Sequence, residues 1–323
     1  MKNKKSIMTF SALQILIFHL WINVFNNEIE MFLKLTAYIG VDIFFFVSAY
    51  SLGNRSVDSY KEFILNRFYA IYTKYIIFAL ISSCYKHWST VRLFKVICGI
   101  ELLEKGGGAY LWFIPAIMMF YILYPLLQHC DKRNRTITLL ISSIVWFVGA
   151  TIITKHTSLN HLTIIWNRIP IFYLGYYTNI LSKKSNILKS TAFKITTGVL
   201  LLIIGTLLLY RFGYKSKLNT PFIDMYYIMG IPLSIGLIFI LDNVPETKLI
   251  KSVGASTLEM YAIQMTFGYV IVNKIFKFIG NSMLTNIISL SLIIIISIAT
   301  HYLYELMNRV VRNRKGKVKS NVI

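Results

Sequence analysis

Two ionisable residues interrupt the first two strongly apolar segments of the chain. His19 stands in the run Ile15-Leu-Ile-Phe-His-Leu-Trp21, and Asp42 stands in Gly40-Val-Asp-Ile-Phe-Phe-Phe46. An ionisable side chain in hydrocarbon costs several kcal/mol, so each needs a partner, a hydrated cavity or a chemical role. A histidine beside a carboxylate can act as a general base, because the carboxylate orients the imidazole and supports its charged form. The same two groups could instead form a hydrogen bond that only joins two helices.

Basic side chains near the ends of later apolar segments indicate possible anion sites. Arg67 precedes one such segment and Lys74 lies near its start, and guanidinium and ammonium groups suit the phosphate groups of an anionic ligand. Basic residues at inner helix ends are also a general feature of membrane proteins, which is the alternative interpretation. Arg168 is expected at about the depth of Asp42, its nearest candidate partner, or it could stabilise a developing oxyanion. Snorkelling of Arg168 to the outer headgroups is the alternative here.

Four further residues have both a structural and a functional interpretation. Trp112 near a predicted interface is more often an aromatic anchor than a ligand contact. Glu259 is expected near the inner interface, where water would solvate it. His301 and Glu305 are four residues apart and share a helix face, so they could form a last-turn pair or belong to a site. The sequence contains no metal-binding motif and no hydrolase nucleophile elbow.

The elements that must position these residues are membrane helices. Hydrophobic residues make up 56% of the chain and charged residues 15%, which is too apolar for a soluble domain of 323 residues. A helix needs about 20 residues to cross a bilayer, and it satisfies its own backbone hydrogen bonds there. The sequence therefore predicts an all-α membrane protein, a polytopic bundle of about ten transmembrane helices near residues 7–25, 35–53, 68–85, 109–127, 136–153, 162–181, 192–210, 222–241, 255–273 and 284–307. Residues 90–103 are shorter and are expected to be interfacial or re-entrant.

The distribution of charge predicts how this bundle is oriented. The net charge is +21, and roughly two thirds of the 34 lysines and arginines fall on the predicted inner side, which places both termini in the cytoplasm. Because the charges are scattered over short loops and tails, nucleic acid is not an expected partner. We expect a single membrane domain over residues 1–310 and a basic cytoplasmic tail over 311–323 that meets anionic headgroups. Three cysteines share no metal-ligand spacing and are expected to be packing residues.

The motifs and their order resemble the integral-membrane acyltransferase family 3. The matching motifs are His19, the Gly-Val-Asp-x-Phe-Phe-x-x-Ser-x-Tyr run from Gly40, Arg67 with Tyr72, Trp112-Phe with Tyr121-x-x-x-Pro, the Arg-x-Pro-x-Phe-x-x-Gly run from Arg168, and Ser256 with Tyr261. The resemblance covers nearly the whole chain. It departs at Met8, Ala70 and Gln264, where the family often has a basic residue, an arginine and a histidine. Glutamine keeps the hydrogen bonding of histidine but cannot exchange protons.

The resemblance implies an enzyme of the bacterial cell membrane. It would move an acyl group, usually acetyl, from cytoplasmic acyl-CoA to a hydroxyl of a cell-surface or exported glycan, with no bound cofactor. His19 would be the general base or transient acyl carrier and Asp42 would orient it, while Arg67 and Lys74 bind the donor. The residues assigned to the acceptor or to charge stabilisation are Arg168, Tyr261, Gln264, Trp112 and Glu305.

Two other functions remain open from the sequence. A transporter or flippase for a glycan or lipid-linked intermediate would also place polar groups inside a bundle, although no inverted repeat and no matched pair of broken helices is visible. Because three polar groups of the family pattern are missing, the chain could also be a divergent or catalytically inactive member, or a partner subunit of an active enzyme.

Overall fold

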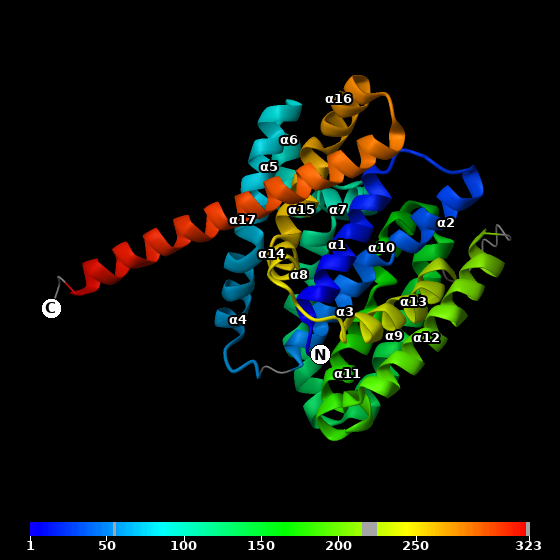
Figure 1. The fold of residues 1–323 in the computed structure, drawn as a ribbon. Helices are drawn as coiled ribbons and strands as arrows, with labels where there is room; N and C mark the ends of the chain where they lie inside the picture. Colours follow the sequence, from blue (N-terminus) through cyan, green and yellow to red (C-terminus); the bar gives the residue numbers. More distant parts are fainter. Residues whose placement is uncertain (54–55, 215–224, 321–323) are drawn as a thin grey trace.

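The computed structural model describes the chain except for residues 54–55, 215–224 and 321–323. It describes side chains in the rest of the chain except at residues 27, 31, 35, 212–214, 225–229 and 311–320. Within the described residues, all regular secondary structure is helical (Figure 1). The all-α class predicted from the sequence is therefore confirmed.

The helices follow one another with short connections. The first part of the chain forms α1 (Lys4–Leu20), α2 (Asn27–Ala37), α3 (Gly40–Leu52), α4 (Tyr60–Arg67), α5 (Thr73–Lys86), α6 (Thr90–Ile97), α7 (Ile100–Lys105), α8 (Phe113–Arg133) and α9 (Arg135–Lys155). The second part forms α10 (Thr163–Trp166), α11 (Ile169–Lys184), α12 (Thr191–Leu208), α13 (Met225–Leu241), α14 (Lys248–Ala255), α15 (Thr257–Ile263), α16 (Tyr269–Ile279) and α17 (Ser282–Ser320). Three π-helical segments, η1 (Phe68–Tyr72), η5 (Leu209–Tyr214) and η6 (Gln264–Gly268), continue or join these helices.

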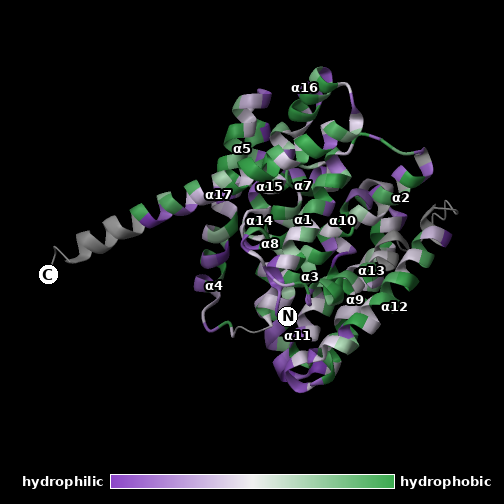
Figure 2. Cartoon of the chain, viewed as in Figure 1, coloured by the Kyte–Doolittle hydropathy of each residue, from purple (hydrophilic) through white to green (hydrophobic). Residues whose placement is uncertain are grey.

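Several helices have the length and composition of membrane spans. Among the residues that the structure describes, five stretches qualify by both criteria, namely Tyr60–Lys86, Phe113–Arg133, Arg135–Lys155, Thr191–Arg211 and Ser282–Val310, and shorter apolar helices occupy Gly40–Leu52 and Gly230–Leu241. Figure 2 shows apolar residues along most of the helices and polar residues gathered at helix ends such as the α11–α12 connection, and many large apolar side chains are exposed at the surface, among them those of α9 and α12. An apolar exterior of this extent requires lipid as its solvent. The protein is therefore a multi-pass helical membrane protein.

Helix α3 lies in the core and packs against α1, α11 and α13. Glycines permit two of these close approaches. A Cβ atom at Gly40 would lie 2.6 Å from the Ser11 carbonyl oxygen, and one at Gly175 would overlap the Phe46 carbonyl oxygen. The backbones of α1 and α11 therefore touch α3 directly, and the side chains of α3 divide between these neighbours.

Residues 90–103 form the short helices α6 and α7, so the prediction that they do not span is confirmed. Glu101 of α7 is 2% exposed and ties this region to the start of α8. Its carboxylate accepts hydrogen bonds from Lys105 Nζ (2.8 Å), the Tyr110 amide (3.0 Å) and Arg92 Nε (3.1 Å). The next residue, Leu111, has a φ of +47°, which is unusual for a side chain of this size. These contacts fix the direction in which the chain enters α8.

The last helix, α17, has 39 residues and is about 58 Å long at 1.5 Å per residue. Its C-terminal part extends away from the helical body (Figure 1). The predicted basic tail, residues 311–323, begins within this helix. Its side chains and residues 321–323 lie outside the described part of the chain.

Candidate functional site

A cavity of about 280 Å³ lies among α1, α3, η1, α5, α8, α15 and η6. This volume is near the lower limit for a cavity that binds a small molecule. Two stripes of side chains at helical spacing line it, Lys4, Met8, Ala12 and Ile15 from α1 and Val41, Phe44, Ser48 and Ser51 from α3. Phe113, Ile117 and Tyr121 of α8 line a third side.

The charges that line this cavity are all positive. Lys4, Arg67 and Lys74 line it, and no carboxylate is among its described lining residues. Lys4 Nζ donates a hydrogen bond to Ser51 Oγ at 2.6 Å, and the Arg67 guanidinium lies 5.3 Å from the centre of the Tyr121 ring. The structure thus brings Arg67 and Lys74, the two predicted donor-binding residues, to one cavity. An anion in this cavity would find a favourable electrostatic environment.

The three positions at which the sequence departs from the family pattern meet in this same cavity. Met8, Ala70 and Gln264 all line it. Lys4 lies four residues before Met8, and Lys74 lies four residues after Ala70, and both of these lysines also line the cavity. Lys4 and Lys74 therefore place positive charge one turn from Met8 and Ala70. Lys5, the neighbour of Lys4, instead donates to the Gly254 carbonyl at 3.1 Å.

Gln264 is the polar group that most directly suggests a ligand. It is 3% exposed, and neither its amide oxygen nor its amide nitrogen has a hydrogen-bond partner in the described structure. A buried amide without partners costs free energy unless a bound group satisfies it. Gln264 begins the π-helical segment η6, and Ala70 lies in the π-helical segment η1. Such π-helical turns are frequent at functional sites. Tyr261, whose hydroxyl is also buried, lines the cavity beside Gln264.

His19 lies next to this cavity but does not line it. It follows Ile15 by four residues, so it continues the stripe of α1 that forms the cavity wall. Its side chain is exposed at the surface of the bundle, and its ring centre lies 4.9 Å from that of Phe18. In the described residues, no hydrogen bond or ion pair joins His19 to Asp42. The predicted contact between these two groups is therefore absent from the structure.

Asp42 instead pairs with Arg168. Arg168 Nε lies 3.1 Å from Asp42 Oδ1, and the two side chains are 0% and 5% exposed. The guanidinium lies over two aromatic rings, 4.9 Å from the centre of Tyr38 and 5.6 Å from that of Trp112. The Asp42–Arg168 pair that was predicted from the depths of the two residues is thus present, and it joins the start of α11 to α3. Neither residue is among those that line the cavity.

The environment of Glu259 differs most from the one predicted from the sequence. It is 1% exposed, so the expectation that water solvates it is wrong. Its Oε1 lies 2.6 Å from Lys74 Nζ and 3.1 Å from His301 Nδ1. The physical reason is that α5, α15 and α17 meet at this point, and the carboxylate is the counter-ion of a lysine buried between them. An acidic residue within an apolar segment was a signal in the sequence that could have pointed to a buried partner, but not to which helices supply it.

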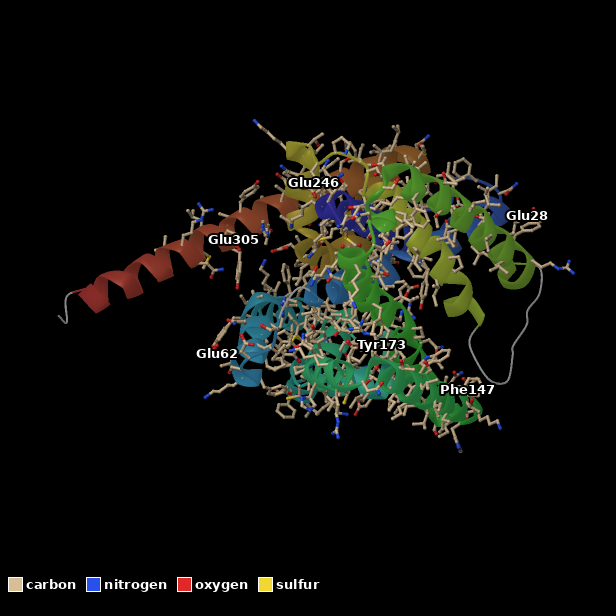
Figure 3. The ribbon with its side chains drawn as sticks, turned by 90° about the horizontal axis from the view of Figure 1, so that it is seen from below. Glu28, Glu62, Phe147, Tyr173, Glu246 and Glu305 are labelled. Carbon is tan, nitrogen blue, oxygen red and sulfur yellow. The ribbon has the colours of Figure 1, made fainter. Side chains whose placement is uncertain are left out.

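Trp112 and Glu305 lie apart from the cavity. Trp112 is 6% exposed and packs over Arg168, so it is a core residue and the expected interfacial anchor is wrong. Glu305 lies on α17, near where this helix leaves the body (Figure 3), and is half-buried. The last-turn pair of His301 and Glu305 is not formed, because His301 contacts Glu259.

The structure is thus a multi-pass helical membrane protein with buried ion pairs and a central cavity lined by cations. Comparison with known proteins gives the family. The chain matches the family model of the acyltransferase 3 domain over residues 7–304, and it therefore belongs to this family of membrane acyltransferases. No curated protein and no solved structure matches the chain.

Proposed function

We propose that the protein transfers an acyl group, most simply acetyl, from cytoplasmic acyl-CoA to a hydroxyl of a cell-surface or exported glycan. The observation that carries this proposal is the central cavity, which has cationic, apolar and unpartnered polar surfaces. Lys4, Arg67 and Lys74 supply cations for donor phosphates. The apolar walls suit the donor arm and its short acyl group, and Gln264 can donate a hydrogen bond to the thioester carbonyl oxygen.

In the proposed reaction, the acceptor hydroxyl oxygen attacks the thioester carbonyl carbon. A C–O bond forms, the C–S bond breaks, and the hydroxyl proton passes to the thiol of the released coenzyme A. His19 is the candidate general base, because it lies one turn beyond the cavity wall on an exposed face that an acceptor can reach. Tyr261 and Gln264 are the candidate groups that stabilise the developing oxyanion. Asp42 and Arg168 support this site through the position of α3.

The orientation of the bundle is part of the proposal. Ten crossings with both termini in the cytoplasm of a bacterial cell would turn Lys4, at the N-terminal end of α1, toward cytoplasmic acyl-CoA. His19 lies at the other end of α1, about 22 Å away along the helix axis. The donor would then enter from the inner side and the acceptor would meet it near the outer side.

A transfer assay tests this function. Membranes that contain the protein would be incubated with radiolabelled acetyl-CoA and a cell-envelope glycan extract. We expect label in a base-labile glycan ester with the wild-type protein, and none with His19→Ala. The absence of transfer from a protein verified as folded would reject the proposed reaction in favour of transport or of an inactive family member.

A further inference from the structure

Glu259 is a buried carboxylate without a role in the proposed reaction. Glu259 Oε1 accepts hydrogen bonds from Lys74 at 2.6 Å and contacts His301 at 3.1 Å. The side chains of Lys74 and Glu259 are 11% and 2% exposed. The other carboxylate oxygen, Oε2, has no hydrogen-bond partner in the described structure. Oε1 therefore makes both contacts of this carboxylate, and these contacts join α15 to α5 and α17.

This pair occupies the boundary between two cavities. Lys74 lines the central cavity and also a second cavity of about 560 Å³ bounded by α5, α15, α16 and α17. Glu259 lines only the second cavity. The lysine thus stands between the carboxylate that holds it and the space in which the donor is proposed to bind.

A structural role alone does not account for a charged pair at this place. Replacement of a buried ion pair by apolar residues of similar size is often neutral or stabilising, so stability gives a weak reason for one. A lysine has a long, flexible stem, whereas an arginine presents a rigid fork. Ala70, one turn before Lys74, lines the same cavity without a charge, so Lys74 is the cation of this part of the wall. A flexible side chain requires a second group to hold its ammonium in place.

We propose that Glu259 is a positioning residue, which holds the Lys74 ammonium at the wall of the central cavity for an anionic group of the acyl-CoA donor. His301 supports the carboxylate from α17, and the Tyr304 ring lies 4.6 Å from Lys74 Nζ on the same side. This inference rests on the proposed function. It assigns to α17 a part in donor binding that no motif of the sequence indicates.

The test measures binding of coenzyme A to the purified full-length protein by calorimetry, with the unfolding temperature measured in parallel. We expect Lys74→Met and Glu259→Gln each to weaken binding by about tenfold, the loss of one charged contact. Because Glu259 acts through Lys74, the double variant should bind no more weakly than Lys74→Met alone. A structural role would lower the unfolding temperature but leave the affinity of the folded protein unchanged.

Two further variants keep the test decisive. Asp131→Asn breaks another ion pair, Arg135–Asp131, which lies outside the central cavity; we expect it to affect stability and not affinity. If Glu259→Gln fails to fold, the apolar pair Lys74→Met with Glu259→Leu is measured against Lys74→Met. Full affinity in folded Glu259→Gln would overturn the inference alone. Failure of the wild-type protein to bind coenzyme A would overturn the proposed function as well.

Discussion

Two of the buried carboxylate–cation pairs in this bundle have different surroundings. Asp42 and Arg168 join α3 to α11 and are sealed among aromatic rings. Glu259 and Lys74 join α15 to α5, and their lysine lines the central cavity. The first pair can do little except determine how its helices pack. The second pair can present a charge to a ligand. A buried charge in a membrane bundle therefore does not by itself identify a binding site. A cavity next to the charge is also needed.

The comparison also separates the predicted catalytic residues. His19 continues the cavity wall of α1, whereas Asp42 faces away from the cavity toward α11. On this basis we expect chemistry to depend on His19 and packing to depend on Asp42.

The largest expected effect is that of His19→Ala. Loss of a general base lowers a transfer rate by about 10²–10⁴-fold, with little change in the unfolding temperature, because the His19 side chain is exposed. The assay is label transfer from acetyl-CoA, with His156→Ala in an exposed loop as the control. An unchanged rate in the folded His19→Ala variant would remove the distinction between the two regions.

The next largest effect is expected on the stability of the protein when the Asp42–Arg168 pair is broken. Arg168→Met leaves Asp42 buried without its ion-pair partner, and we expect it to destabilise the protein by about 3–5 kcal/mol. The double variant Asp42→Leu with Arg168→Met should recover most of this loss. Thermal unfolding in detergent measures both. Loss of acyl transfer in a stable double variant would show that Asp42 has a role in the chemistry after all.

A smaller effect is expected from Gln264→Leu in the central cavity. The substitution removes a buried amide without partners, so the unfolding temperature should stay the same or rise. The rate of acyl transfer should fall on the order of tenfold, since a hydrogen bond to the reacting carbonyl is worth about 1–3 kcal/mol. Gln14→Leu is the matched control, because Gln14 is a buried glutamine of α1 that does not line the cavity. Equal activity in the two variants would argue against a ligand at Gln264.

The smallest effect concerns Glu101, a carboxylate in the short helix α7. Burial by itself raises the pKa of Glu101, but the hydrogen bonds from Lys105 and the Tyr110 amide, with Arg92 nearby, lower its pKa overall from the usual 4.5. A lowered pKa in the folded state stabilises the protein above pH 4.5, and this contribution is lost as the pH falls through the folded-state pKa. Glu101→Gln should therefore unfold at a temperature that changes less between pH 7 and pH 4 than that of the wild type. An identical pH dependence would contradict this.

Part of the site was predictable from the sequence. The Asp42–Arg168 pair followed from the two depths, because charges in an apolar bundle must find each other. Arg67, Lys74, Tyr261 and Gln264 were identified as candidates from motifs, and they do line one cavity. Glu259 was misplaced, because its neighbours in sequence gave no sign that α5 and α17 enclose it. The sequence could not show that Lys4 lines the cavity, because this depends on which face of α1 meets the cavity.

The sequence by itself determined the class of this protein. An apolar composition with apolar segments of spanning length permits only helices in lipid, and the order of the motifs identified the family that the comparison confirmed. Only the tertiary structure decided which polar residues share a space. Each residue turns a helix by about 100°, so Asp42 faces α11 while Val41 and Phe44 face the cavity. Motif spacing gives depth along a helix, but the packing of the other helices decides what each face meets.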